Sequence, residues 1–360
     1  MTDHRAQCIE RTRSFCSEYN VRIPVLLAPM AGASPPSLSI AVANAGGLGA
    51  CGALLMPPAA IKAWASDVRL ATNGGFQLNL WIPDPQPQRD EAAEIAVRSF
   101  LAKWGPEVPA SAGDATPPDF DAQCETMLEV GPAIISSFMG LYPPAFVTRM
   151  KAAGIRWFAN VTTVAEAKAA EAAGADVLVA QGMEAGGHRG AFDATQAEPG
   201  MVGLFALLPA VVDAVKIPVI ATGGIGDARG AAAALLLGAS AVQIGTCFLR
   251  SPEARLPTSW ADGIGRAMPE DTMVTRAFSG RAGRSLGTAY ARAASASDAP
   301  RPAPYPVQRG LTQPMRDAAV ASNNLERMQA WSGQSGRLAR TASATDIARD
   351  VWEETLRTLS

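Results

Sequence analysis

Histidine is nearly missing from this chain of 360 residues, which contains only His4 and His188. Two distant imidazoles cannot form a histidine cluster for a metal, and neither an H-E-x-x-H nor a C-x-x-C pattern occurs. The cysteines are odd in number and widely spaced, which disfavours a disulfide framework and a zinc ribbon: Cys8, Cys16, Cys51, Cys124 and Cys247. We therefore expect a cytoplasmic protein with reduced cysteines and no metal site.

An excess of charge of either sign is also missing. The formal net charge is -2, so no basic field suggests a nucleic-acid partner. The N-terminal "MTDHRAQCIERTR" is too charged for a signal peptide. Two stretches lack charged residues, between Arg22 and Lys62 and between Arg229 and Arg250, but Gly, Pro, Ser or Asn interrupts both. We expect neither to cross a membrane and interpret both as buried core.

Short apolar segments alternate with alanine-rich segments through the first 250 residues. The apolar segments predict eight strands, at 25–29, 48–52, 76–80, 133–138, 155–160, 176–180, 218–222 and 241–245. Helices or long loops are expected after each, and strands buried on both faces are typical of parallel sheets. Eight such units predict an α/β fold, a (β/α)8 TIM barrel, with an open doubly wound sheet as the alternative.

The composition changes after Arg250, where Pro, Arg, Ser and Gly become frequent. We expect residues 1–250 to form the barrel, with an N-terminal helix at 5–20 and an insertion at 81–131 after the third strand. Residues 251–320 are expected to form a smaller, mostly helical substrate-side domain. Residues 321–360 are expected to return to the barrel as helices, and 312–334 is itself predicted to be helical.

Glycines gather where the predicted strands end. They occupy positions 186, 187, 190, 223, 224, 226 and 245. Glycine lets backbone N–H groups approach an anion, so the loop 223–226 and the end of the eighth strand could hold one phosphate. The run "GGIGDARG" departs from G-x-G-x-x-G at Arg229 and follows the seventh strand, which favours a mononucleotide over a dinucleotide. A tight turn without a ligand is the alternative.

Five motifs together resemble the class I branch of the nitronate monooxygenase family, formerly called 2-nitropropane dioxygenases. They are "PVLLAPMAG", "QLNLW", "AQGMEAGGHRG", "IPVIATGGIGDARG" and "GASAVQIGTCFL". The resemblance implies a barrel that binds FMN. It implies FMN contacts by Pro29, Met30, Asn79, Gln181, Gly186, Gly187, Gly223, Gly224, Gln243, Ile244, Gly245 and Thr246. The amides of Asn79 and Gln181 suit a flavin edge because they both donate and accept, although capping of loop carbonyls is the alternative.

His188 lies within the glycine-rich "EAGGHRG". The resemblance gives it the role of the base that takes the α-proton of a nitroalkane, and an imidazole is mostly neutral near pH 7. A histidine hydrogen-bonded within its loop is the alternative. A carboxylate on the substrate could pair with an arginine, and we considered Arg189, Arg276, Arg281 and Arg284. Two tyrosines were considered as pocket-lining residues, Tyr142 and Tyr305.

The resemblance implies oxidative denitrification of alkyl nitronates by O2, which yields a carbonyl compound and nitrite. Propionate 3-nitronate is the expected substrate, nitroalkanes are further substrates, and the chain is expected to be a monomer or homodimer. One alternative is an NAD(P)H-dependent flavin reductase of the enoyl-acyl carrier protein reductase or quinone reductase type. The other is a catalytically silent flavin-binding or assembly protein.

Overall fold

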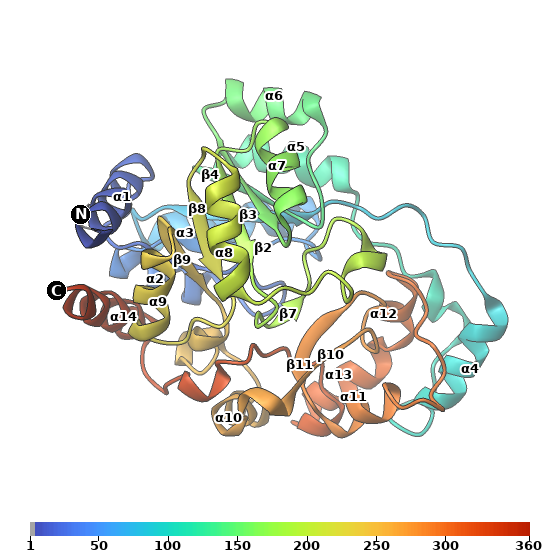
Figure 1. Ribbon diagram of the computed structural model, residues 1–360. Helices are drawn as coiled ribbons and strands as arrows, with labels where there is room; N and C mark the ends of the chain where they lie inside the picture. Colours follow the sequence, from blue (N-terminus) through green and yellow to red (C-terminus); the bar gives the residue numbers. More distant parts are fainter. Residues whose placement is uncertain (1–3) are drawn as a thin grey trace.

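Eight parallel strands form a ring in the computed structural model, which describes residues 4–360 (Figure 1). They are β1 (Val25–Leu27), β2 (Gly49–Gly52), β3 (Phe76–Trp81), β4 (Ile134–Phe138), β5 (Arg156–Val161), β6 (Val177–Gln181), β8 (Val219–Thr222) and β9 (Ala241–Ile244). Their order is β1-β9-β8-β6-β5-β4-β3-β2, and a parallel bridge between Leu26 and Leu48 joins the first to the last. The eight predicted strands and the barrel are confirmed, and the open sheet is not observed.

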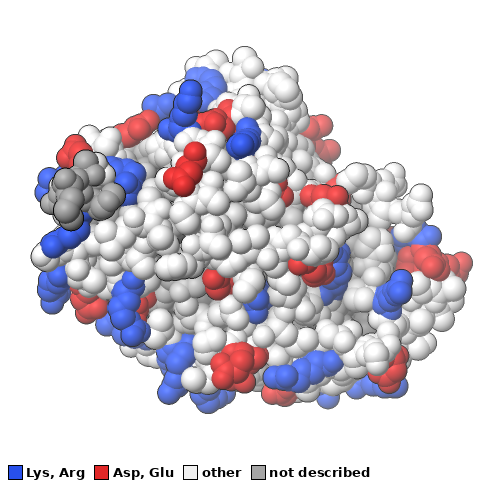
Figure 2. Space-filling model, in the orientation of Figure 1, with Lys and Arg blue, Asp and Glu red and all other residues white. Residues whose placement is uncertain are grey.

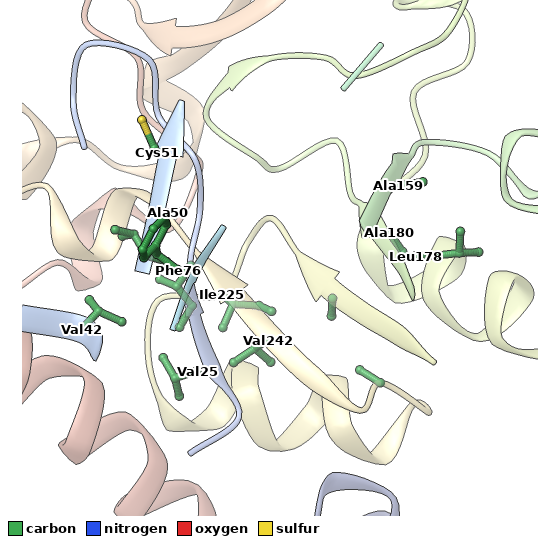
Figure 3. Close-up of a cluster of buried hydrophobic side chains, with 14 of the residues drawn as sticks. Val25, Val42, Ala50, Cys51, Phe76, Ala159, Leu178, Ala180, Ile225 and Val242 are labelled. Carbon is green, nitrogen blue, oxygen red and sulfur yellow. The ribbon is translucent and has the colours of Figure 1, made fainter. Parts of the chain in front are cut away.

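Helices cover the outside of the ring. They are α2 (Pro36–Ala45), α3 (Pro58–Ala71), α5 (Phe120–Val130), α6 (Pro144–Ala152), α7 (Val164–Ala172), α8 (Leu204–Ala214), α9 (Ala228–Leu236) and α14 (Ala344–Leu359). Apolar side chains of the strands pack against this layer, as Figure 3 shows for Val25 of β1 and Val242 of β9 beside Val42 of α2. Both faces of each strand are therefore covered, as parallel sheets require.

Alternate residues of each strand point into the ring, because alternate residues of a strand share a face. These inward-pointing residues form two layers of different polarity. The layer near the strand starts is apolar: Leu26, Leu48, Ile134, Phe158, Val177, Val179, Ile220 and Ala241. Phe15 of α1 (His4–Glu18) and Tyr19, which follows that helix, close this end. The layer near the strand ends is polar: Gln77, Asn79, Ser136, Asn160, Gln181, Thr222 and Gln243. The polar layer is the floor of the site.

A second packed unit lies over the strand ends. It contains α10 (Thr258–Arg266), α11 (Ala289–Ala294), α12 (Val307–Leu311) and α13 (Gln313–Ala321). It also contains an antiparallel sheet that the sequence did not predict, β10 (Thr272–Thr275), β11 (Gly283–Leu286) and β7 (Gly187–His188). Val97 and Leu101 of α4 (Glu91–Leu101) pack in the same apolar cluster as Phe278 and Met315. Part of the insertion at 81–131 therefore packs with this unit.

The predicted helix 312–334 is wrong beyond Ala321, where α13 ends. Asn323 adopts a left-handed backbone (φ 49°), which ends the helical path. Residues 330–332 then run along β11, where Leu286 N donates to Ala330 O at 2.9 Å and Trp331 bridges to Ser285. This extended conformation depends on a distant strand, so local sequence could not reveal it.

The chain ends on the barrel. There α14 packs against α2 and α9. The Arg5 guanidinium donates to the Ser360 carbonyl, so the two ends lie together (Figure 1). Short 3-10 turns connect several elements: Ala110–Asp114, Ala194–Gln196, Thr246–Phe248, Pro252–Ala254, Pro269–Asp271, Leu325–Arg327 and Gly336–Leu338. Figure 2 shows charges of both signs intermixed on one face. No helix in residues 4–360 has the length and apolar character needed to cross a bilayer.

Candidate active site

A cavity of about 350 Å³ lies between the polar end of the barrel and the overlying unit. A volume of this order suits a small organic ligand. All thirteen residues singled out from the sequence line it: Pro29, Met30, Asn79, Gln181, Gly186, Gly187, His188, Gly223, Gly224, Gln243, Ile244, Gly245 and Thr246. The structure therefore brings residues from five strand ends into one place.

Gln181 holds the loop that carries His188. Its Nε2 donates to the His188 carbonyl at 3.0 Å, and its Oε1 accepts from Gly190 N at 2.8 Å. Both polar atoms of this amide are therefore engaged by the protein, which is the loop-capping arrangement. Asn79 differs, since its Nδ2 donates to Ser136 while its Oδ1 accepts no hydrogen bond from the described chain.

Two buried amide atoms on the cavity floor lack a partner among residues 4–360. They are Oε1 of Gln77 and Nδ2 of Asn160. An unsatisfied buried polar group costs about 1–3 kcal/mol, so this pair indicates a ligand with both a donor and an acceptor. The sequence analysis missed both residues. The signal for Gln77 was its position two residues before Asn79, on the same face of β3.

The opposite end of the cavity is lined by glycine backbone. Gly223 (φ 100°) and Gly224 (φ 72°) have left-handed conformations that other residues rarely adopt. The N–H groups of Gly223, Gly224, Gly245 and Thr246 donate to no acceptor in residues 4–360. These amides are free to bind an anion, and the sequence predicted a phosphate at this position.

The N-terminus of α9 is not available to that anion. The Asp227 carboxylate accepts from the N–H groups of Arg229 and Gly230. The first turn of α9 is therefore capped by a side chain of the protein itself.

The segment 328–335 forms a wall of the cavity that the sequence analysis missed. Gly333 N donates to Thr246 Oγ1 at 2.9 Å, and Ser335 Oγ donates to the Gly224 carbonyl. A Cβ atom on Gly186 would lie 2.4 Å from Gly333 N, so these two backbone segments can approach this closely only because residue 186 is glycine. The glycines and serines of "WSGQSG" were the available signal.

His188 is enclosed by aromatic rings. Trp81 lies 4.6 Å away and Trp331 lies 4.8 Å away, both edge-on to the imidazole. Its Nε2 is 2.7 Å from Ser279 Oγ, and its Nδ1 has no partner in residues 4–360. The ring is thus held at one nitrogen while the other stays available in the cavity.

The surroundings of His188 keep the imidazole neutral. Burial, followed by the positive charges of Arg281, Arg309 and Arg316, lowers the pKa of His188 to about 3. The ring is therefore neutral over the ordinary pH range, where it can accept a hydrogen bond but is a weak base.

The four arginines considered from the sequence do not line the cavity. Each has another partner: Arg189 donates to the Gln181 and Thr162 carbonyls, Arg276 pairs with Glu198, Arg281 pairs with Asp84 at 3.0 Å, and Arg284 donates to the Met183 carbonyl and Thr272. Buried guanidinium groups require such partners, and the sequence did not reveal which arginines were already paired.

Two other arginines face the cavity, Arg309 and Arg316. Arg316 is fixed by the side chains of Gln313 and Gln329, whereas the Arg309 guanidinium has no hydrogen-bond partner in the described chain. Burial lowers the pKa of both groups, and the positive charge of Arg309 contributes to the shift at Arg316. Two adjacent cations in a cavity indicate an anionic ligand.

The two tyrosines considered have different positions. Tyr142 is packed in the barrel core, where its hydroxyl donates to the Ser136 carbonyl, and it does not line the cavity. Tyr305 lines the cavity, its ring lies 5.5 Å from that of Trp81 in a tilted arrangement, and its buried hydroxyl has no partner in residues 4–360.

Comparisons with known proteins identify the family and support the fold. A nitronate monooxygenase from Paraburkholderia phytofirmans is 37% identical over 92% of each chain. A probable nitronate monooxygenase from Staphylococcus aureus is 35% identical over 92% of this chain and 94% of its own. The structure of nitroalkane oxidase from Streptomyces ansochromogenes has a TM-score of 0.85 at 32% identity, covering 96% of this chain and 100% of its own. FabK from Thermotoga maritima has a TM-score of 0.75 at 29% identity, covering 96% of each chain. The family model "Nitronate monooxygenase" matches residues 13–354, so the chain belongs to the nitronate monooxygenase family and is an oxidoreductase.

Proposed function

We propose that the protein uses FMN and O2 to convert alkyl nitronates into carbonyl compounds and nitrite. Propionate 3-nitronate is the proposed substrate, and nitroalkanes are slower ones. One observation carries this proposal: a neutral imidazole, two cations and a floor with unpartnered amide atoms share a single cavity.

The residues present fit FMN. The pyrimidine edge of a flavin offers an N–H donor and carbonyl acceptors, which match the acceptor of Gln77 and the donor of Asn160. The amides of Gly223, Gly224 and Thr246 would hold the phosphate. When bound there, FMN would supply the electron acceptor between the nitronate and oxygen.

The protein contributes binding, exclusion of water and proton transfer. Trp81, Trp331 and Tyr305 surround the space next to His188 and limit access of water. With a nitroalkane, neutral His188 takes the α-proton. An imidazole with a pKa near 3 is a weak base, so a substrate that arrives as a nitronate avoids the unfavourable step.

The two arginines support a dianionic substrate. Propionate 3-nitronate carries a carboxylate in addition to the nitronate, and Arg309 has a guanidinium free to bind it. Arg316 adds a second positive charge held in place by its own hydrogen bonds. We also propose that residues 251–320 form the substrate-side domain, because they supply Tyr305, Arg309 and Arg316 to the cavity.

The test is aerobic turnover of propionate 3-nitronate with purified, FMN-loaded protein and no NAD(P)H. We expect nitrite release and oxygen consumption, and their absence would refute the proposal. Similarity to FabK supports one second candidate, an NAD(P)H-dependent flavin reductase. Rapid bleaching of the flavin by NADH under anaerobic conditions would favour that candidate.

A further inference from the structure

Ser279 is the only described side chain that hydrogen-bonds to the imidazole of His188, at 2.7 Å from Nε2. It is buried, and its Oγ also lies 3.3 Å from both the N–H and the carbonyl of Arg281. The following Gly280 (φ 87°) packs so tightly that a Cβ would lie 2.4 Å from the Ala303 carbonyl. The hydroxyl is therefore held in a rigid turn.

Only one arrangement of hydrogens gives the Ser279 hydroxyl, His188 and the Arg281 backbone all of their hydrogen bonds. A serine oxygen accepts two hydrogen bonds and donates one. If Nε2 of His188 carries the proton, Ser279 accepts from Nε2 and from the Arg281 N–H, and donates to the Arg281 carbonyl. If Ser279 instead donates to Nε2, the proton on Nδ1 has no acceptor in residues 4–360 and the Arg281 carbonyl loses its donor.

We propose that Ser279 is a positioning residue that holds His188 as the Nε2–H tautomer, so that Nδ1 is the atom that takes the substrate proton. This inference rests on the proposed function for the identity of the proton donor. The α-carbon–hydrogen bond breaks, its electron pair remains on the nitronate and the proton forms a bond to Nδ1. Nε2–H keeps its bond to Ser279 throughout, and the Arg281 carbonyl supports the resulting cation through the hydroxyl.

The tautomer can be observed directly because the chain has only two histidines. Protein labelled with 15N-histidine should give two imidazole patterns in long-range 1H–15N correlation spectra, and the His188→Asn variant assigns them. We expect His188 to carry its proton on Nε2 at pH 7. A proton on Nδ1 in the unaltered protein would overturn the proposal, whether or not the protein oxidises nitronates.

Substitution tests whether Ser279 is the cause. Ser279→Ala should convert His188 to a mixture of tautomers, and Ser279→Thr, which keeps the hydroxyl, should restore the Nε2–H form. Ser285→Ala is the matched control, because Ser285 is also buried, lies on β11 and donates to the Leu286 carbonyl at 2.9 Å. An unchanged tautomer in Ser279→Ala would overturn the proposal.

The kinetic test separates proton transfer from the rest of the reaction. Ser279→Ala should lower kcat/KM for nitroethane by about five- to tenfold, the effect of one neutral hydrogen bond. Oxidation of preformed ethyl nitronate should change by less than about twofold, since no proton is removed. Equal losses on both substrates would show a structural role and refute the inference. A parent protein that does not oxidise ethyl nitronate would refute the proposed function, while the spectra would still report the tautomer.

Discussion

Replacement of Arg309 by methionine tests whether the cavity recognises a carboxylate. The guanidinium faces the cavity without a protein partner, so its loss leaves no buried acceptor unsatisfied. A hydrogen bond to a charged group contributes about 1.5–3 kcal/mol, which corresponds to about 10- to 150-fold in kcat/KM. We expect a loss of this size for propionate 3-nitronate, and a change of less than about threefold for propyl 1-nitronate, which lacks the carboxylate.

The assay is nitrite release under initial-rate conditions for both nitronates. Arg276→Met is the matched control, because Arg276 belongs to the same unit but pairs with Glu198 outside the cavity. It should affect neither substrate by more than about threefold. Equal losses on both nitronates in Arg309→Met, or a loss of the same size in Arg276→Met, would refute carboxylate recognition by Arg309.

Four further predictions concern His188 and the cavity floor. His188→Asn should lower kcat/KM for nitroethane by about 100-fold or more while ethyl nitronate is still oxidised, as measured by oxygen uptake; equal retention of both activities would remove the role as base. Because burial lowers the pKa of His188 to about 3, kcat/KM for nitroethane should show no loss of the base between pH 8 and pH 5, and an inflection near pH 6.5 would contradict this. The same shift means that the unfolded chain binds a proton which folded His188 does not, so His188 favours the folded state fully above about pH 6.5. As the pH falls toward 3, this contribution should be lost by up to about 1.4 kcal/mol per pH unit. The measurement is the difference in unfolding free energy between the parent and His188→Asn at each pH. Asn160→Leu removes an unpartnered donor, so the thermal midpoint of the flavin-free protein should not fall. The same variant should bind FMN about tenfold more weakly in a fluorescence titration, and an unchanged affinity would exclude Asn160 as a ligand group.

The barrel could be predicted because most strands are recognisable locally, as short and mainly apolar segments followed by a helix or a long loop. The same regularity placed Asn79 and Gln181 at strand ends, where both line the cavity. Their hydrogen-bond partners could not be predicted, and Gln181 turned out to be engaged by the loop it supports.

The arginines show why the rest of the site was not predictable. Arg281 and Arg309 look alike in the sequence, yet a carboxylate from the distant Asp84 pairs with the first and leaves the second facing the cavity. Residues 328–335 present the same difficulty at the level of the backbone. Residues 330–332 within this segment are held extended by β11, about 45 positions earlier, and not by their own propensities.

The late position of the segment 328–335 has a consequence for biosynthesis. A chain cut before Trp331 keeps every strand of the ring and the glycines of the seventh and eighth connections, but it lacks the residues that seal them. Such chains also lack α14, which packs on α2 and α9, so only a product translated through its last helix has both the complete helical layer of the barrel and the sealed cavity.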